Sequence, residues 1–251
     1  MTTRRVVLVT GASGYLGSVI ARACADDGWS VAVHYRSARE QAERLVADIR
    51  ERGGEAMSVH ADLAGDPANA TRMVADVVEH FGHLDAVVNN SADQAVRALS
   101  ALTDRDWQDM LQATFLAATR TTEAVVSHLV PGGCVVNVSS VEASSAFPNH
   151  AHYAAAKAAM ESFTRSLALE LGPRGMRANA VAPGLIEREG LAEAWPEGHR
   201  WWSVTSPQRR AVTAEEVAAA VVFLLDQRAS GINGVVLPVD GGWSASARAP
   251  F

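Results

Sequence analysis

The sequence lacks several features that would place it in a specialised class of protein. Basic residues are not in excess, because 22 lysines and arginines stand against 28 acidic residues in a chain of 251, for a net charge of -6. Nucleic acids and anionic membranes are bound by basic faces or stripes, so we expect neither as a partner. No apolar run is long enough to span a membrane, and residues 6–10 are too few for the core of a signal peptide. We therefore expect a cytoplasmic protein.

Cysteine and linker-like sequence are also scarce. The two cysteines, Cys24 and Cys134, lie far apart without CxxC spacing, whereas a disulfide-stabilised scaffold needs more cysteines in a shorter chain. Both are expected to be reduced thiols. No Pro-, Gly- or Ser-rich linker and no repeat divides the chain. A single domain over residues 1–251 is the expected organisation.

The histidines give no indication of a metal site. His80 and His83 close a predicted helix, and His150 and His152 precede another, without a set of carboxylates nearby. A bound metal ion needs several convergent ligands. We predict no metal and interpret these side chains as helix caps or solvated tips.

Short β-branched runs alternate with longer stretches of helical periodicity. Several runs are apolar on both faces, which is typical of parallel strands covered by helices on each side. This alternation predicts an α/β fold, a Rossmann-like doubly wound sheet of seven parallel strands with helices on both faces. The expected strands are residues 6–10, 31–35, 56–60, 86–89, 134–138, 178–181 and 234–238, and the expected helices are 14–27, 38–52, 67–81, 104–128, 152–171 and 214–225.

One segment departs from this alternation. Residues 185–208 have weak periodicity but contain three of the six tryptophans, Trp195, Trp201 and Trp202. Such an insertion is typical of a substrate lid or binding loop. Flat aromatic walls suit a polycyclic or heterocyclic substrate, although the rings could equally pack the lid itself or a subunit contact.

A glycine-rich loop follows the first expected strand and opens the first helix, which is the position of a dinucleotide-binding loop. Gly11 permits the tight turn, Gly14 allows backbone to approach a pyrophosphate, and Gly17 lets the helix pack close to the sheet. An ordinary strand-to-helix turn is the alternative, which this position disfavours. The residues expected to bind the dinucleotide here are Gly11, Ser13, Gly14, Tyr15, Leu16 and Gly17.

The end of the second strand indicates which dinucleotide is bound. An NAD site places a carboxylate there for the adenosine ribose, but here Arg36 and Ser37 follow the strand. A guanidinium and a hydroxyl suit the additional phosphate of NADP(H), which is the expected cofactor. A solvated loop charge is the alternative for Arg36. Asp62 and Leu63 are expected at the adenine edge, although Asp62 could instead initiate a turn.

Tyr153 and Lys157 are the candidate chemical groups. They lie four residues apart in a helix-forming run, so both side chains project from one helix face. An adjacent ammonium and an oxidised nicotinamide would both favour phenolate and so lower the pKa of the phenol. Ser140 ends the fifth strand, where an α/β fold binds its ligand, and could donate to a substrate oxygen. Ser139 is its immediate rival, and a surface helix pair is the alternative for Tyr153 and Lys157.

Taken together, these motifs resemble the short-chain dehydrogenase/reductase family in its single-domain form. The resemblance spans nearly the whole chain and implies that Tyr153 is the general acid/base, that Ser140 polarises the carbonyl, and that Lys157 holds the nicotinamide ribose. It also implies cofactor contacts from Asn89, Ser91, Pro183, Gly184 and Ile186. The motifs that carry it are Thr10-Gly11, Asp62, Asn89-Asn90, Ser140 with Tyr153-xxx-Lys157, Pro183-Gly184, and Val239-Asp240-Gly241-Gly242.

The chain departs from the family pattern at several positions. Tyr15 stands where the loop usually has glycine, and Arg188 stands where a threonine often contacts the cofactor. Thr114 occupies the place of the family's active-site asparagine, which organises a water in the proton relay. Its hydroxyl could take that role, or its backbone carbonyl could be left to the water.

The resemblance implies an NADPH-dependent ketoreductase acting on a cyclic or polycyclic carbonyl, with Ser140, Tyr153 and the three tryptophans at the substrate. Composition and the altered catalytic region resemble actinomycete polyketide-tailoring ketoreductases of antibiotic biosynthesis, such as those acting on angucyclines. The alternatives are a pteridine or dihydropteridine reductase and, in a different class, a regulator that senses NADP(H) without turnover. Because residues 154–167 are apolar on more than one helix face, a homodimer or homotetramer is expected.

Overall fold

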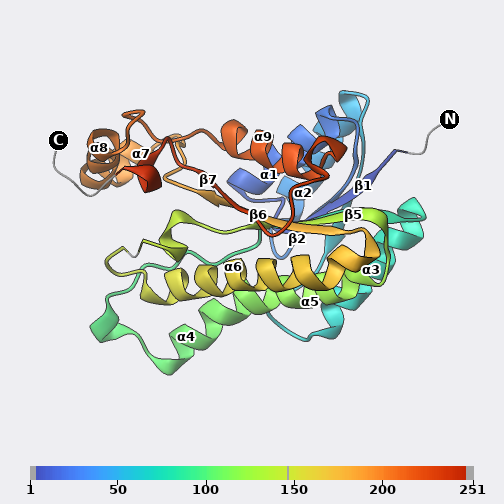
Figure 1. Ribbon diagram of the computed structural model, residues 1–251, viewed down its shortest axis with the longest axis horizontal. Helices are drawn as coiled ribbons and strands as arrows, with labels where there is room; N and C mark the ends of the chain where they lie inside the picture. Colours follow the sequence, from blue (N-terminus) through green and yellow to red (C-terminus); the bar gives the residue numbers. More distant parts are fainter. Residues whose placement is uncertain (1–3, 146, 247–251) are drawn as a thin grey trace.

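The computed structural model describes residues 4–145 and 147–246, and it contains the predicted seven-stranded parallel sheet (Figure 1). The strand order is β3-β2-β1-β4-β5-β6-β7, which confirms the doubly wound Rossmann-like fold. The strands are β1 (Val6–Val9), β2 (Ser30–Tyr35), β3 (Glu55–His60), β4 (Leu84–Asn89), β5 (Leu129–Val138), β6 (Arg177–Pro183) and β7 (Val236–Val239), and the helices are α1 (Tyr15–Asp26), α2 (Arg39–Glu51), α3 (Ala68–Phe81), α4 (Asp104–Leu111), α5 (Ala117–Val126), α6 (Ala151–Leu171), α7 (Leu191–Ala194), α8 (Pro196–Thr205) and α9 (Ala214–Leu225).

Helices cover both faces of the sheet. In Figure 1, α1, α2 and α9 lie above the strands, and α5 and α6 lie below them. A hydrophobic core lies on each face of the sheet, and alternate residues of β1 pack into one or the other. Val7 and Val9 pack on the α1 and α9 side, whereas Val6 and Leu8 pack on the α3 and α5 side. All four are buried. Because both faces are covered, the strand is continuously apolar, which is the pattern that the sequence showed.

The order of the strands positions the functional cleft. β1 is flanked by β2 and by β4, so the chain leaves β1 in one direction along the sheet and later returns to its other side. Ligands of such sheets bind at the carboxyl ends of the strands, beside this change of direction. The loops after β1, β4, β5 and β6 therefore meet at one edge.

The helix predicted over residues 104–128 is not continuous. A π-helical turn, Gln112–Leu116, separates α4 from α5, and α5 ends at Val126. The start of α4 was readable from a capping box, in which the hydroxyl of Thr103 accepts the amide of Asp106. A π turn inserts one residue into the helical ladder and commonly occurs near functional sites. Thr114 lies within it, and no local propensity marks the insertion.

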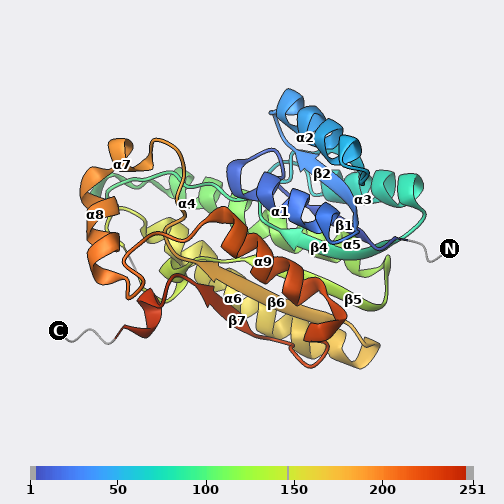
Figure 2. The ribbon, with the colours of Figure 1, turned by 90° about the horizontal axis from the view of Figure 1, so that it is seen from above.

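Residues 185–208 are more regular than expected. They contain α7 and α8, which lie together beyond the carboxyl ends of the strands in both views (Figures 1 and 2). Pro196 starts α8 at the position where a helix tolerates proline. The Trp195 ring lies against Gly198, because a Cβ there would be 1.9 Å from it. The weak periodicity thus reflects two short helices.

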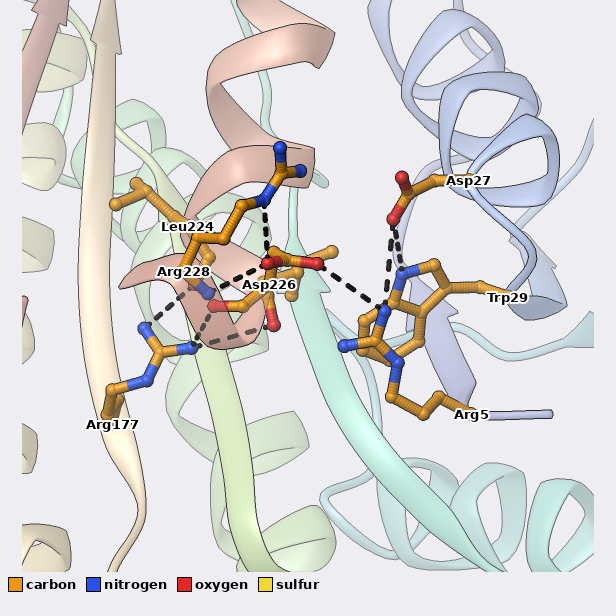
Figure 3. Close-up of polar contacts among 8 residues, drawn as sticks. Arg5, Asp27, Trp29, Arg177, Leu224, Asp226 and Arg228 are labelled. Atoms are coloured by element: carbon orange, nitrogen blue, oxygen red, sulfur yellow. Dashed lines mark hydrogen bonds and ion pairs between the residues drawn. The ribbon is translucent and has the colours of Figure 1, made fainter. Parts of the chain in front are cut away.

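At the opposite end of the strands, arginines hold α9 to the sheet (Figure 3). Arg177 is buried and donates to the carbonyls of Leu224, at 2.8 Å, and Asp226, at 3.2 Å. It therefore satisfies carbonyls that the end of α9 leaves without helical partners. Arg5 lies 4.1 Å from the centre of the Trp29 ring and 3.7 Å from Asp226. None of the helices in the described ranges is long and apolar enough to cross a membrane.

Candidate active site

A cavity of about 1150 Å³ opens over the carboxyl ends of the strands. Its walls come from the loops after β1, β2, β3, β4, β5 and β6, from the first turns of α6, and from α7 and α8. Most of the residues singled out in the sequence line it: Gly11, Ser13, Gly14, Tyr15, Leu16, Gly17, Arg36, Ser37, Leu63, Ser91, Ser140, Tyr153, Lys157, Pro183, Gly184, Ile186, Trp195 and Trp202. Asp62, Asn89, Thr114 and Trp201 do not.

The glycine loop is shaped to receive an anion at the start of α1. Gly11 has a φ of +63°, and a Cβ on Gly17 would lie only 2.3 Å from the Gly11 carbonyl oxygen. The helix therefore approaches the loop as closely as glycine allows. Its N-cap, Gly14, supplies no side-chain hydrogen bond, so the first amides of α1 are left for a ligand. This arrangement fits a pyrophosphate.

His34 supports this loop and was missed in the sequence. Its Nδ1 accepts the amide of Gly11 at 2.9 Å, so its Nε2 donates to the carbonyl of Ala61 at 3.0 Å. Burial lowers the pKa of His34 to about 4 and keeps the ring neutral. A polar residue within the apolar β2, beside the end of β1, was the available signal.

Asn89 does not line the cavity, which corrects the sequence prediction. Its side chain is buried within the sheet layer and donates to Thr122 at 2.9 Å and to Asn137 at 2.8 Å. The next residue, Asn90, lines the cavity and donates to the carbonyl of Thr10 at 2.9 Å. Because side chains alternate along a strand, only one asparagine of the pair can face the loop.

The region after β2 retains the predicted basic character. Arg36 and Ser37 are exposed at the cavity wall. Asp62 instead borders a neighbouring hollow of about 580 Å³, which it shares with Arg36. Its carboxylate accepts the amide of Ala64 at 3.2 Å, so it acts as the turn initiator that was considered as its alternative role.

Tyr153 and Lys157 come together inside the cavity. Both are buried, and the Nζ of Lys157 lies 5.5 Å from the centre of the Tyr153 ring. Nζ donates to the carbonyl of Val138 at 2.7 Å. This contact uses one of its three N–H donors and fixes the ammonium against β5. The geometry is that expected from an i, i+4 pair on one helix face.

The structure separates the two serines after β5. The hydroxyl of Ser139 donates to Glu161 at 3.0 Å. Ser140 accepts the amide of Glu142 at 3.2 Å, lines the cavity with Tyr153, and lowers the pKa of its phenol. Ser140 is therefore the serine that accompanies the tyrosine.

The pKa of Tyr153 differs from the value that the sequence led us to expect. Burial, followed by the charge of Glu142, raises the pKa of Tyr153 to about 12, whereas hydrogen bonds from Ser140 and Gln94 lower it. Burial also lowers the pKa of Lys157 to about 8. The phenol is thus not made acidic by the protein itself, because loss of solvation and the charge of Glu142 outweigh the effects of Ser140 and Gln94. At neutral pH Tyr153 carries its proton.

Thr114 does not contact the cavity, which corrects the role expected for its hydroxyl. The hydroxyl accepts the amide of Asp93 at 3.1 Å and donates to the sulfur of Met110 at 3.4 Å. The side chain is fully buried. It therefore holds the loop after β4 against the π turn, and the alternative that remains for a relay is a backbone carbonyl.

His150 is not a solvated tip, and a carboxylate does lie beside it. It lines the cavity, with its ring centre 5.0 Å from that of Tyr153. Its Nδ1 is 3.0 Å from an oxygen of Glu142, eight residues earlier in the chain. The tertiary fold brings the two together, so the sequence held no signal for the pair. No group of three potential metal ligands occurs in the described residues.

The three tryptophans have different positions. Trp195 lines the cavity and is 46% exposed. Trp202 is only 2% exposed and stacks on Trp243, with ring centres 5.1 Å apart. Trp201 packs edge-on against Phe147 and does not line the cavity. Of the two rings that line the cavity, Trp195 is therefore the exposed one, whereas Trp202 is packed against Trp243.

A pair of side-chain contacts, here called the latch, joins the glycine loop to residues 185–208. The hydroxyl of Tyr15 donates to the carbonyl of Glu187 at 2.8 Å. The carboxylate of Glu187 pairs with Nε2 of His199, on α8, also at 2.8 Å. The tyrosine that replaces the usual glycine therefore connects the two sides of the cavity.

The chain is similar to known oxidoreductases over almost its whole length. Residues 11–244 match a family model described as enoyl-(acyl carrier protein) reductase. A hydroxynaphthalene reductase-like protein of Metarhizium majus is 34% identical over 252 residues, covering 95% of this chain and 94% of that protein. The promiscuous reductase LugOII, which catalyses a keto-reduction during lugdunomycin biosynthesis, has a TM-score of 0.89 at 30% identity, covering 96% of this chain and 98% of its own. A gluconate 5-dehydrogenase from Burkholderia cenocepacia, in complex with NADP and tartrate, has a TM-score of 0.90 at 28% identity, covering 97% and 96%.

Proposed function

Because the chain belongs to the short-chain dehydrogenase/reductase family and is therefore an oxidoreductase, we propose that it is an NADPH-dependent ketoreductase. The observation that carries this proposal is the convergence of Ser140, Tyr153 and Lys157 in the cavity that the glycine loop also lines. Acid, polarising hydroxyl and cation thus share one site with a place for a dinucleotide.

The residues present fit a nicotinamide dinucleotide. The uncapped start of α1 and the close approach at Gly17 suit a pyrophosphate. Arg36 and Ser37 would hold the phosphate on the adenosine ribose, where NAD sites carry an acid. The N–H donors that Lys157 does not give to Val138 would hold the nicotinamide ribose. When bound, the cofactor supplies hydride for the carbonyl carbon.

The protein's own groups complete the reduction. Tyr153 gives its proton to the carbonyl oxygen as the oxygen gains electrons, and Ser140 donates a hydrogen bond to the same oxygen. A phenol whose pKa is raised to about 12 is protonated at neutral pH, so it is ready to act as the acid. Lys157 stabilises the phenolate that forms. Burial limits the contact of all three side chains with bulk solvent.

For the substrate, we propose a cyclic or polycyclic, polyketide-like carbonyl compound. The cavity is large enough for a fused-ring molecule beside a dinucleotide. Trp195 offers a partly exposed ring at its mouth, which suits stacking. The hydroxynaphthalene reductase-like protein, at 34% identity, is named for a fused-ring compound, and LugOII, at 30% identity, is described as catalysing a keto-reduction.

The test is NADPH oxidation with 2-tetralone and 9,10-phenanthrenequinone, with dihydrobiopterin and NADH as comparisons. Tyr153→Phe should lower kcat about a thousandfold while NADPH still binds, because general acid catalysis of this kind contributes 10²- to 10⁴-fold. Unchanged turnover by Tyr153→Phe would overturn the assignment. Preferential reduction of dihydrobiopterin would make the protein a pteridine reductase.

A regulator that binds NADP(H) without turnover is the alternative from another class. The placement of the Thr114 hydroxyl away from the cavity favours it, because the usual relay side chain is missing. NADPH binding without oxidation by any carbonyl compound tested would support this alternative.

We also propose a cytoplasmic homodimer or homotetramer. Leu169, on α6, is 80% exposed, and Ala155 and Ala158 are exposed nearer the start of the same helix. Such a face is suited to burial against a second copy. Sedimentation as a monomer at micromolar concentration would contradict the oligomer.

A further inference from the structure

Two titratable side chains frame the stretch between Ser140 and Tyr153. Glu142 lies in the turn after β5, and His150 is the N-cap residue of α6. The imidazole Nδ1 is 3.0 and 3.1 Å from the two carboxylate oxygens, and each side chain is 17% exposed. The two groups therefore form a largely buried pair at the cavity wall. This pair has no part in the roles proposed for Ser140, Tyr153 and Lys157.

The pair touches both residues that act on the carbonyl oxygen. The ring of His150 lies 5.0 Å from that of Tyr153, tilted by 36°. The backbone amide of Glu142 donates to the hydroxyl of Ser140 at 3.2 Å. A change in the charge of the pair therefore changes the electrostatic potential at the phenol, because both groups are largely buried and solvent screens their interaction only weakly.

The charge of the pair depends on His150. Hydrogen bonding to Glu142 raises the pKa of the imidazole above 6.5, against the opposing effect of burial, and the Gln94 carbonyl contributes in the same direction. Glu142 in turn raises the pKa of Tyr153. An imidazolium cancels the carboxylate's charge, whereas a neutral imidazole leaves it beside the phenol. His152, two residues after His150, is influenced by the charges of His150, Asp106, Asp93 and Arg97.

We propose that Glu142 and His150 are a positioning pair for Tyr153, neutral and supportive of proton transfer while His150 is protonated, and inhibitory once that proton is lost. This role rests on the proposed function. During reduction, the O–H bond of Tyr153 breaks, a bond from that proton to the substrate oxygen forms, and negative charge develops on the phenol oxygen. A net charge of -1 on the pair opposes that development. An enzyme cannot alter the equilibrium constant of its reaction. The unpaired carboxylate therefore slows both carbonyl reduction and alcohol oxidation.

The decisive measurement is the pH profile of kcat/KM for 2-tetralone at saturating NADPH. In the wild type, activity should fall about three- to tenfold as His150 deprotonates above pH 6.5, the size expected for one partly screened charge. In Glu142→Gln this step disappears, and activity stays at the higher level until Lys157 loses its proton near pH 8. In His150→Gln the step also disappears, but activity stays at the lower level because the carboxylate is unpaired at every pH.

These opposite signs separate electrostatic positioning from structural damage, which would lower both variants alike. His128→Gln, at an exposed histidine after α5, is the matched control and should retain the wild-type profile. Two variants that both keep the wild-type step, or that both fall to the same level, would overturn the proposal.

A second measurement does not need turnover. With ¹³C-labelled histidine, the NMR signal that disappears in His150→Gln should titrate above pH 6.5 and should move to lower pH in Glu142→Gln. If the titration midpoint of His150 is the same in Glu142→Gln as in the wild type, the role of the pair is overturned and the proposed function is not. Absence of any carbonyl reduction, in contrast, overturns the proposed function and the role of the pair with it.

Discussion

The two sides of the cavity are built in different ways. The glycine-loop side uses backbone groups and small residues whose positions follow from the strand order, as in the contact of Gly11 with His34. The opposite side, which includes Glu142, His150 and residues 185–208, uses pairs of side chains, as in Glu142 with His150 and Glu187 with His199. A site for a common cofactor can be specified by backbone geometry, whereas a site for a particular substrate requires individual side chains.

Protonation of His34 is expected to have the largest effect, a loss of folding stability that originates on the glycine-loop side. Because the pKa of His34 is about 4 in the folded protein and 6.5 in its unfolded reference, the unfolded state binds more protons between these values. The contribution of neutral His34 to the free energy of unfolding is therefore fully present above pH 6.5. It is lost as pH falls towards 4, and the loss amounts to up to about 3 kcal/mol. Urea unfolding across this range tests it. His34→Gln should flatten the dependence, and an equally steep loss in that variant would contradict the prediction.

Two glycines test how closely α1 approaches its loop. A Cβ on Gly17 would lie 2.3 Å from the Gly11 carbonyl, whereas one on Gly14 would lie 3.3 Å from it. Gly17→Ala should therefore lower the free energy of unfolding by about 2 kcal/mol, as overpacking does, and Gly14→Ala by much less. Thermal or urea unfolding of both variants gives the comparison. Equal losses would mean that close packing is not what the loop requires.

Arg36 tests whether the cofactor preference belongs to the glycine-loop side. Arg36→Ala should raise KM for NADPH about tenfold, because a charge-assisted contact with the ribose phosphate is lost. KM for NADH should stay nearly constant, and this serves as the internal control. A parallel rise for both cofactors would assign Arg36 a structural role instead.

The smallest expected effect lies on the latch that joins the two sides. Tyr15→Phe removes only the hydroxyl that donates to Glu187, a change of about 1 kcal/mol. KM for 2-tetralone should rise a few-fold, and proteolysis within residues 185–208 should become faster. Unchanged values of both would show that residues 185–208 are held by packing, including the stacked Trp202 and Trp243.

The sequence predicted most of the elements and the chemical residues, because periodicity and loop position are local properties. Tyr153 and Lys157 were readable from their spacing, and Lys157 is also the single lysine among the 22 lysines and arginines. The π turn at Thr114 and the choice between Asn89 and Asn90 were not readable. Both depend on contacts with segments that are distant in sequence, such as Thr114 with Asp93 and Asn89 with Asn137.

By itself the sequence determined the sheet, its glycine loop and the helix face that carries Tyr153 and Lys157, since apolar period and i, i+4 spacing act within one element. Only the tertiary structure decided that His150 meets Glu142, that Trp202 is packing, and that burial raises the pKa of Tyr153 to about 12. Proton affinity depends on solvent exclusion and on charges from every neighbouring element, and these exist only after the chain has folded.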